Sequence, residues 1–377
     1  MIGQIIKRVY FMQPKLRFRK FVFSLLVLSL TIPTTIQPGL TASKDQVWMS
    51  VPVFYATSRQ YDKDLGMYSG RRSPEHTDHG LEYGIVTSVI PVPSSITPND
   101  IAIANLPLKS ASRKDAKGHS ELEKLSREEF YKRLSGSTKS TKFNEACLFV
   151  HGYNNGFEAA AKSAARLETA LCEPVVLFSW PSAAKTRDYT VDECNAEWSA
   201  RPFQVFAQGL EKQIGPENLM SVSHSMGNRL VNWYLQSRYD ASNREPKHLK
   251  EIVLTSPDID RGTFKNYFYK IANNGDRVRL YISEKDLPLR LSQFVHGAPR
   301  TGAGLTKEEN KWDMPGNITP TQTVNFTEVD DSKIGHSIQY KLIGSMHRTD
   351  NPGDGLKLEQ DKEYKGEYLR VLRTRNK

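Results

Sequence analysis

The sequence predicts an α/β fold: a doubly wound, mostly parallel sheet with helices on both faces and an antiparallel extension on its N-terminal side. From Glu145 onward, apolar runs of about six residues alternate with helical stretches. These runs are continuous in Val, Ile and Leu, which is typical of parallel strands buried on both faces. Right-handed crossovers between such strands place helices on both faces of the sheet.

Two strand-like segments precede this alternating series. VWMSVPVFYATSRQ (residues 47–60) and LEYGIVTSVIPVPSS (81–95) are rich in β-branched and aromatic residues. The polar stretches that follow them, about residues 61–80 and 110–120, are expected to be mobile loops. The two segments therefore form the predicted antiparallel extension.

Six strands, each followed by a helix, are predicted after Glu145. The strands are ACLFVHG, EPVVLFSW, LMSVSHS, EIVLTSP, RVRLYIS and TVNFTEVDD. The helices are GFEAAAKSAARLETAL, WSARPFQVFAQGLEKQI, MGNRLVNWYLQSR, RGTFKNYFYKIANN, LPLRLSQFV and SIQYKLIGS. We expect one domain over residues 43–377 with its core at about 145–347, a third mobile loop at about 298–320, and a solvated basic tail, LRVLRTRNK.

The formal charge of the 377-residue chain is +10, but it is placed unevenly. Residues 1–42 carry six basic side chains and no acidic one, which leaves +4 for the remainder. So modest a charge gives no reason to expect a nucleic-acid partner. The content of 38% hydrophobic and 25% charged residues excludes a disordered chain and a protein with many membrane spans.

The basic cluster leads directly into an apolar segment, Phe21–Ile32. Pro33 ends this segment well short of the roughly 20 apolar residues that a membrane-spanning helix needs. A basic region before a short apolar run is typical of a secretory signal. Residues 1–42 are therefore predicted to be a signal peptide or an uncleaved N-terminal anchor, and the protein is expected in the periplasm or outside the cell. Membrane contact is expected only through this segment.

The chain has three cysteines, Cys147, Cys172 and Cys194. Cys147 and Cys172 each precede a predicted strand, so they would lie at one end of the sheet, either as a disulfide or as buried thiols. No CxxC or HExxH motif occurs, and the histidines of PEHTDHG (74–80) lie in a predicted loop. We therefore expect no metal site.

The candidate nucleophile is Ser225, in the segment LMSVSHSMGNRL. A strand ends here and a helix begins at once, as in the nucleophile elbow G-x-S-x-G, with Ser223 in place of the first Gly. Such a turn exposes the serine hydroxyl and directs the next amide, that of Met226, toward a developing oxyanion. The alternative for Ser225 is an ordinary helix N-cap.

The second amide of an oxyanion hole is expected after the earlier strand, in CLFVHGYNNGF. Gly152 allows a sharp turn and close approach of the backbone. The N–H of Tyr153 is the candidate donor. His151 is expected to fix this loop rather than to act as a base, and the alternative for the whole segment is a simple helix-entry loop.

The candidate base is His336, in the loop DDSKIGHS directly after the last predicted strand. A nucleophile of this type needs a base, which follows it in the chain. Of the other histidines after Ser225, His248 lies at the wrong end of the sheet, and His296 and His347 lie late in helices. Only the His336 loop is expected to reach over Ser225.

The candidate acid is Asp286, in the exit loop of the strand RVRLYIS. Glu284 lies nearby but follows the strand immediately, so its side chain is expected to point away. Asp258 and Asp260, in SPDID after the preceding strand, are the alternatives. Their competing role is to cap the helix that follows.

Several segments also resemble one bacterial family, the α/β-hydrolase-like proteins catalogued as domain of unknown function 900. They are VFYATSR (53–59), FVHGYNNGF (149–157), FSWPSAAK (178–185), HSMGNR (224–229), LTSPDID (254–260), YISEKDLPLRLS (281–292) and GHS (335–337). The resemblance covers most of the chain from about Val51. It implies an α/β-hydrolase fold and a Ser225–Asp286–His336 triad, and it supplies no substrate.

These features together predict a serine hydrolase acting on a small-molecule or lipid-like ester, thioester or amide, without a metal or organic cofactor. Trp180 and Tyr189 are expected either to line the substrate pocket or to be buried as core. Two alternative functions are consistent with the same features: an inactive hydrolase-fold binding protein of the cell envelope, and an acyltransferase that uses the same triad.

Overall fold

A computed structural model describes residues 46–74, 78–93, 108–115, 119–141, 144–240, 247–273, 277–304, 321–361 and 367–374. The predicted leader, residues 1–42, lies outside this part of the chain. So does most of the loop expected at 298–320, of which residues 298–304 are described.

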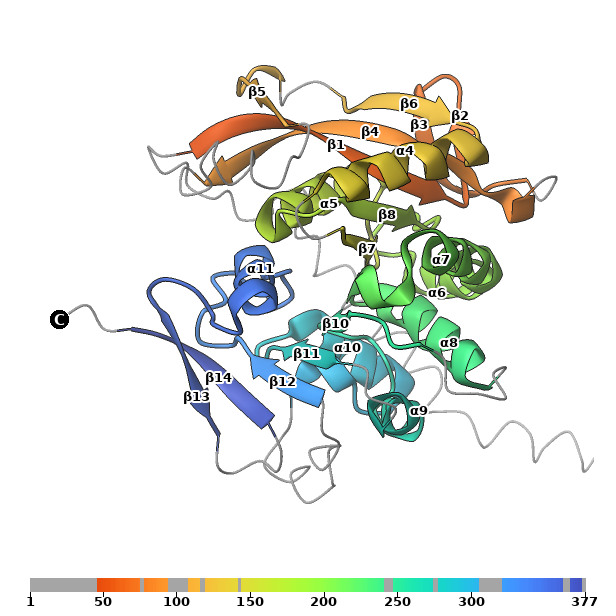
Figure 1. Cartoon of the computed structure of the whole chain (residues 1–377). Coiled ribbons are helices and arrows are strands. Elements are labelled where there is room, and N and C mark those ends of the chain that lie inside the picture. Colours follow the sequence, from red (N-terminus) through yellow and green to blue (C-terminus); the bar gives the residue numbers. More distant parts are fainter. Residues whose placement is uncertain are drawn as a thin grey trace, which may run out of the picture.

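The described strands form one large sheet and a separate two-stranded sheet. The large sheet has twelve strands, in the order β13-β14-β12-β11-β10-β9-β7-β8-β1-β4-β6, with β5 beside β1 (Figure 1). Its parallel centre consists of β7 (Ala146–Val150), β8 (Val175–Ser179), β9 (Leu219–His224), β10 (Glu251–Thr255), β11 (Val278–Ile282) and β12 (Thr321–Asn325). Every residue of β7 to β11 is buried, as expected for parallel strands covered on both faces. The predicted α/β class is thereby confirmed.

The N-terminal extension is antiparallel and continuous with this centre. β1 (Gln46–Thr57) pairs with β4 (Glu82–Pro93) along its whole length, and β4 pairs with β6 (Glu121–Leu125). The last four residues of β1 also pair in parallel with β8, from Phe54↔Val176 to Thr57↔Ser179. This register brings the end of β1 to the carboxyl ends of the central strands.

The stretches predicted as loops at 61–80 and 110–120 contain strands instead. β2 (Arg59–Asp62) and β3 (Met67–Arg72) form a hairpin, and β5 (Lys109–Ala111) pairs with β1. Their polar composition suggested loops, but Asp62 Oδ1 accepts the Leu65 amide in the tight turn, and Tyr61 packs on Tyr68 with ring centroids 5.4 Å apart. Local hydrogen bonds and aromatic pairing thus order the hairpin.

Residues 369–374 of the basic tail belong to or adjoin a strand and are not a solvated terminus. β13 (Leu356–Gln360) and β14 (Glu367–Arg373) extend the sheet past the predicted core limit, and β14 pairs in parallel with β12. Arg370 Nε lies 2.5 Å from Asp361 Oδ2, and Arg373 Nη2 lies 2.6 Å from Asp331 Oδ1. Tyr368 and Val371 of β14 are buried in the core, and the ion pairs partner the arginines that lie between and after them.

Helices cover both faces of the sheet. They are α4 (Arg127–Ser140), α5 (Phe157–Leu171), α6 (Tyr189–Trp198), α7 (Ala200–Ile214), α8 (Gly227–Asp240), α9 (Arg261–Asn273), α10 (Leu287–His296) and α11 (Tyr340–Thr349). Phe130, Phe203 and Leu230 of α4, α7 and α8 share one buried cluster, whereas Ala160 of α5 and Leu342 of α11 share another. Each face therefore has its own core, and no helix in the described ranges is long and apolar enough to cross a membrane.

No disulfide joins the three cysteines, all of which lie in described parts of the chain. Cys147 is fully buried in β7, Cys172 is partly buried at the end of α5, and Cys194 is exposed. Of the two alternatives for Cys147 and Cys172, the structure therefore has the one without a disulfide.

Candidate active site

Ser225 occupies a strained turn between β9 and α8. Its φ is +52°, a left-handed conformation that costs a non-glycine residue about 1–3 kcal/mol. The Ser225 amide donates to Thr255 O at 3.0 Å, and Asn228 Nδ2 donates to Ser225 O at 2.9 Å. Hydrogen bonds from two neighbouring elements therefore hold this residue in a conformation that it would not adopt alone.

Close packing explains the small residues around Ser225. A Cβ on Gly227 would lie 2.4 Å from His151 O, so only glycine fits between α8 and the end of β7. Ser223 departs from the glycine of the elbow pattern, and its buried Oγ donates to Asn228 Oδ1 at 2.8 Å. The departure thus adds a bond to the residue that holds Ser225.

The loop after β7 lies directly against the elbow. A Cβ on Gly152 would come within 2.9 Å of Ser225 Cβ. In the parts of the chain that the structure describes, neither the Tyr153 nor the Met226 amide donates a hydrogen bond. Two N–H donors that bind no other group of the described residues thus lie at Met226, directly after Ser225, and at Tyr153, in the loop packed against it.

The neighbouring amides of this loop are bonded. Asn154 N donates to Asp192 Oδ2 at 3.2 Å, and Asn155 N donates to Ser182 Oγ at 3.1 Å. The loop is therefore ordered by its other amides, and the Tyr153 N–H does not take part in holding it.

The His151 side chain fixes the loop after β7 by hydrogen bonds, as the sequence predicts. Its Nδ1 donates to Gly152 O at 2.8 Å, because a carbonyl oxygen can only accept, and its Nε2 accepts from Arg59 Nη2 at 3.3 Å. Burial, together with the Arg59 charge, lowers the pKa of His151 to about 3. This imidazole therefore stays neutral and is not available as a base.

Arg59 is a residue whose part in the site the sequence did not reveal. Its side chain is fully buried at the start of β2, two residues after β1 ends, and burial lowers its pKa to about 9. The guanidinium donates to Ser179 Oγ at 2.8 Å, to Ser182 O at 3.0 Å and to Asn155 O at 2.7 Å. One side chain thus ties the exits of β1, β7 and β8 together beneath the candidate oxyanion loop.

Asp286 and His336 are brought together, although they are 50 residues apart. The fully buried Asp286 caps α10 by accepting the Leu289 amide through Oδ1 at 2.9 Å. Its Oδ2 accepts from His336 Nδ1 at 2.7 Å. A Cβ on Gly335 would lie 2.4 Å from Lys285 O, so glycine lets the histidine loop rest on the aspartate loop.

The charge of this pair favours a proton on His336 Nδ1. Burial by itself would lower the pKa of His336, but the adjacent Asp286 carboxylate outweighs it and the net pKa is raised. With Nδ1 held by Asp286, Nε2 is the nitrogen left for exchange of protons.

His336 lies next to the elbow. Its ring centroid is 4.8 Å from that of His224, the residue before Ser225. No hydrogen bond between Ser225 Oγ and His336 is present among the described residues, and such contacts commonly tighten only when substrate binds.

The alternative acids have other partners. Asp258 is bonded to Arg229 Nη2 at 3.0 Å and to Tyr189 OH at 2.6 Å. Asp260 caps α9 through the Thr263 amide, and Glu284 Oε1 accepts from Asn325 Nδ2 at 2.7 Å. Of the acids considered, Asp286 is the one bonded to His336.

Trp180 and Tyr189 differ in their exposure. Trp180 is fully buried, stacks on His151 with centroids 5.0 Å apart and donates Nε1–H to His151 O at 2.8 Å. Of the two alternatives for Trp180, the structure therefore has burial as core. Tyr189 is half-buried, with its ring 5.2 Å from that of Tyr153.

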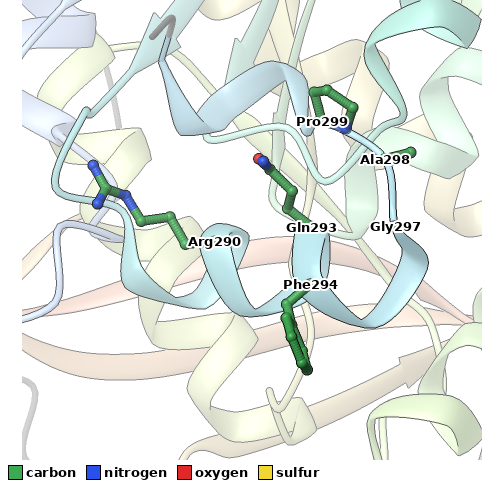
Figure 2. A pocket seen from close by; sticks show the side chains of 6 residues that line it. All are labelled: Arg290, Gln293, Phe294, Gly297, Ala298 and Pro299. Atoms are coloured by element: carbon green, nitrogen blue, oxygen red, sulfur yellow. The ribbon is translucent and has the colours of Figure 1, made fainter. Parts of the chain in front are cut away.

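A surface hollow of about 370 Å³ lies along α10. It is lined by Arg290, Gln293, Phe294, Gly297, Ala298 and Pro299. Figure 2 shows Gln293 directed toward Pro299 and Phe294 directed away from it. None of the lining residues belongs to the elbow or to the Asp286–His336 pair, so this hollow is separate from the candidate site.

Comparison with known proteins identifies a family and distant structural relatives. The chain matches the family described as alpha/beta hydrolase of unknown function (DUF900) over residues 126–342. No curated protein matches it. It is similar to the structure of an esterase/lipase from an uncultured bacterium, with 16% identity and a TM-score of 0.27, over 48% of this chain and 56% of that one.

Two further solved structures are similar at the same level. For EstE5-PMSF (I), the identity is 12% and the TM-score 0.29, over 48% of this chain and 65% of that one. For the propionate-bound esterase Est2 from the Planctomycetes species Thermogutta terrifontis, they are 11% and 0.26, over 48% and 72%. The chain thus spans less than two thirds of the length of the first two of these structures.

The family match covers more than half of the 377 residues. It includes the loops that carry Tyr153, Ser225, Asp286 and His336. The chain therefore belongs to the family of alpha/beta hydrolases of unknown function.

Proposed function

We propose that this chain is a serine hydrolase that cleaves an ester, thioester or amide bond through an acyl-enzyme. Ser225 is the nucleophile, His336 the general base and Asp286 the orienting acid. The observation that carries the proposal is the 2.7 Å bond from His336 Nδ1 to the buried Asp286, in a loop that lies beside the strained Ser225 turn.

The first half-reaction follows from this arrangement. His336 Nε2 accepts the proton of Ser225 as Oγ attacks the carbonyl carbon of the substrate. The carbonyl oxygen becomes an oxyanion, which the Tyr153 and Met226 amides stabilise because their N–H groups bind no other described residue. The resulting imidazolium, held by Asp286, then donates its proton to the leaving group.

The second half-reaction repeats these roles with water. His336 Nε2 removes a proton from a water molecule, whose oxygen attacks the acyl carbon. The second tetrahedral intermediate collapses as Ser225 Oγ regains its proton and leaves. The acid product and the free enzyme result, with water as the second reactant.

A fluorophosphonate probe tests the proposal, because it reacts with an activated serine. We expect the folded chain to be labelled at Ser225, located by peptide mass spectrometry, and Ser225→Ala to remain unlabelled. A panel of esters of varied acyl length should be hydrolysed by wild type and not by Ser225→Ala.

The other outcomes each contradict the proposal in a different way. If the folded protein is neither labelled by the probe nor able to hydrolyse any ester of the panel, the result would favour an inactive binding protein. A label at Ser225, with transfer of the acyl group to an added alcohol in preference to water, would identify an acyltransferase.

A further inference from the structure

A second cluster of ionisable side chains lies at the opposite end of the sheet from Ser225. Glu145 directly precedes β7 and Glu173 lies just before β8, two parallel neighbours that pair at Cys147↔Val175. His347 reaches the same place from the end of α11. Because parallel strands begin at one edge, the register itself brings these two carboxylates together.

The geometry points to a zinc site, which we propose is formed by Glu145, Glu173 and His347. One ligand atom from each residue lies within 4.8 Å of the others. The distance from His347 Nε2 to Glu173 Oε1 is 3.2 Å. Two ligands of a tetrahedral zinc, each about 2.1 Å from the ion, lie about 3.4 Å apart. A solvent water completes the fourth position.

An unsatisfied oxygen supports a cation at this point. Glu173 Oε2 is buried and has no hydrogen-bond partner within the described ranges, and the side chain is only 3% exposed. A buried carboxylate oxygen without a partner is costly. A cation held by both carboxylate oxygens of Glu173 and by His347 would give Oε2 the partner that it lacks.

A further carboxylate already orients the histidine. Glu251 Oε2 lies 2.6 Å from His347 Nδ1, and Arg279 Nη1 holds the other oxygen of Glu251 at 2.8 Å. In metal sites, a ligating imidazole commonly donates its second N–H to such a carboxylate. This bond fixes the ring with Nε2 directed at Glu173, so His347 is preset to ligate through Nε2.

Lys250 competes with zinc for Glu145. Its ammonium forms an ion pair with Glu145 Oε2, and the Glu145 side chain is 15% exposed. Zinc must therefore displace Lys250 and draw Glu145 toward the other two ligands. This displacement gives a direct prediction: removing the lysine charge should strengthen zinc binding.

Zinc at this site would stabilise the fold and take no part in catalysis, because the site lies at the opposite end of the strands from Ser225. It would tie the end of α11 to the starts of β7 and β8. The site does not depend on the proposed hydrolase function, and its test does not use activity.

Calorimetric titration of ZnCl2 into the full chain, after treatment with a chelator, tests the site. We expect one zinc per chain and a rise in the thermal unfolding midpoint. Glu145→Gln and Glu173→Gln should each weaken binding at least tenfold, and Lys250→Met should strengthen it. His119→Gln is the matched control, because His119 also faces a glutamate but is 89% exposed on the surface.

Three results would overturn the site. The first is that folded wild type binds no zinc at millimolar ZnCl2. The second is that binding is undiminished in both glutamate variants. The third is that binding is lost in His119→Gln and kept in Glu173→Gln, which would place zinc elsewhere. Circular dichroism of each variant establishes folding, so the glutamate variants decide the matter even if His347→Gln does not fold.

Discussion

The two ends of the parallel sheet hold the same kind of pair in different settings. At the carboxyl end, His336 Nδ1 meets Asp286 at 2.7 Å, and at the amino end His347 Nδ1 meets Glu251 at 2.6 Å. The difference lies in the second nitrogen. His347 Nε2 faces Glu173 at 3.2 Å, whereas His336 Nε2 makes no hydrogen bond to another described residue.

This difference separates two uses of one side chain. A histidine with one carboxylate is oriented and keeps a nitrogen that can take and give a proton. A histidine between two carboxylates is held in its charged form, or exchanges that proton for a metal ion. The first arrangement suits turnover, and the second suits stabilisation of the fold.

The largest effects are expected when each of the two histidines, His336 and His347, is replaced in turn. We expect His336→Gln to lose about 10⁶-fold in kcat with a small change in stability, because the base is removed and Gln still donates to Asp286. His347→Gln should lower the free energy of unfolding by about 3–5 kcal/mol, because the amide carries no charge and can replace only one of the two bonds to the buried Glu173 and Glu251. Ester hydrolysis and urea unfolding of both variants measure the two effects.

The reverse pattern would break the contrast. If folded His347→Gln lost turnover and His336→Gln kept it, the base would lie at the amino end. The kcat of the folded fraction of His347→Gln should equal that of wild type.

The next effect concerns the acid of the first pair. Asp286→Asn should lower kcat about 10⁴-fold, because the amide favours the wrong tautomer of His336. Asparagine still caps α10, so the fold should be kept. Asp260→Asn is the matched control, since Asp260 also caps a helix and was the alternative acid. Loss of turnover in the control alone would move the acid to the SPDID loop.

Some residues of the proposed site can be predicted from local sequence patterns, and others cannot. The strand ends in the central sheet follow from continuous apolar runs, so Ser225, Asp286 and His336 could each be chosen from a strand exit. Arg59 could not, because its role depends on β1 lying beside β8, and that pairing joins residues about 120 positions apart.

The C-terminal strands and the zinc ligands were missed for a related reason. β14 alternates apolar with charged residues, and its place in the sheet depends on its pairing with β12 and on contacts such as the Arg370–Asp361 ion pair. Glu145, Glu173 and His347 have no motif spacing, since each is supplied by a different element. Sequence patterns predict the elements, whereas contacts between distant elements supply these residues.

A smaller effect is expected from pH, with opposite signs at the two ends. The pKa of His336 is raised, so kcat/KM should rise up to tenfold per pH unit as Nε2 deprotonates and level off above that pKa. Burial lowers the pKa of His347, but Glu173 and Glu251 outweigh it, and the net pKa is also raised. Its protonated form therefore adds stability that is full below about pH 6.5 and is lost as pH rises through the folded-state pKa.

Urea unfolding across pH, with a chelator present, isolates the second effect. The stability difference between wild type and His347→Gln should shrink as pH rises. Lys250, Arg279 and Glu145 also face this cluster and are present in both proteins, so their contributions cancel. A difference that grows with pH would show that His347 is neutral in the folded state.

The smallest expected effect lies within the elbow. Ser223→Ala removes the donor to Asn228 Oδ1, leaving a buried acceptor unpaired at a cost of about 1–3 kcal/mol. Because Asn228 also donates to Ser225 O, the strained turn loses part of its support, and kcat should fall a few-fold. Ser221→Ala is the matched control, from the same buried strand and face but with no hydroxyl bond to a described residue. Equal losses in both variants would mean that packing of β9, rather than the Ser223–Asn228 bond, holds Ser225. A larger loss in Ser223→Ala would show that the serine in place of glycine helps to hold the strained nucleophile.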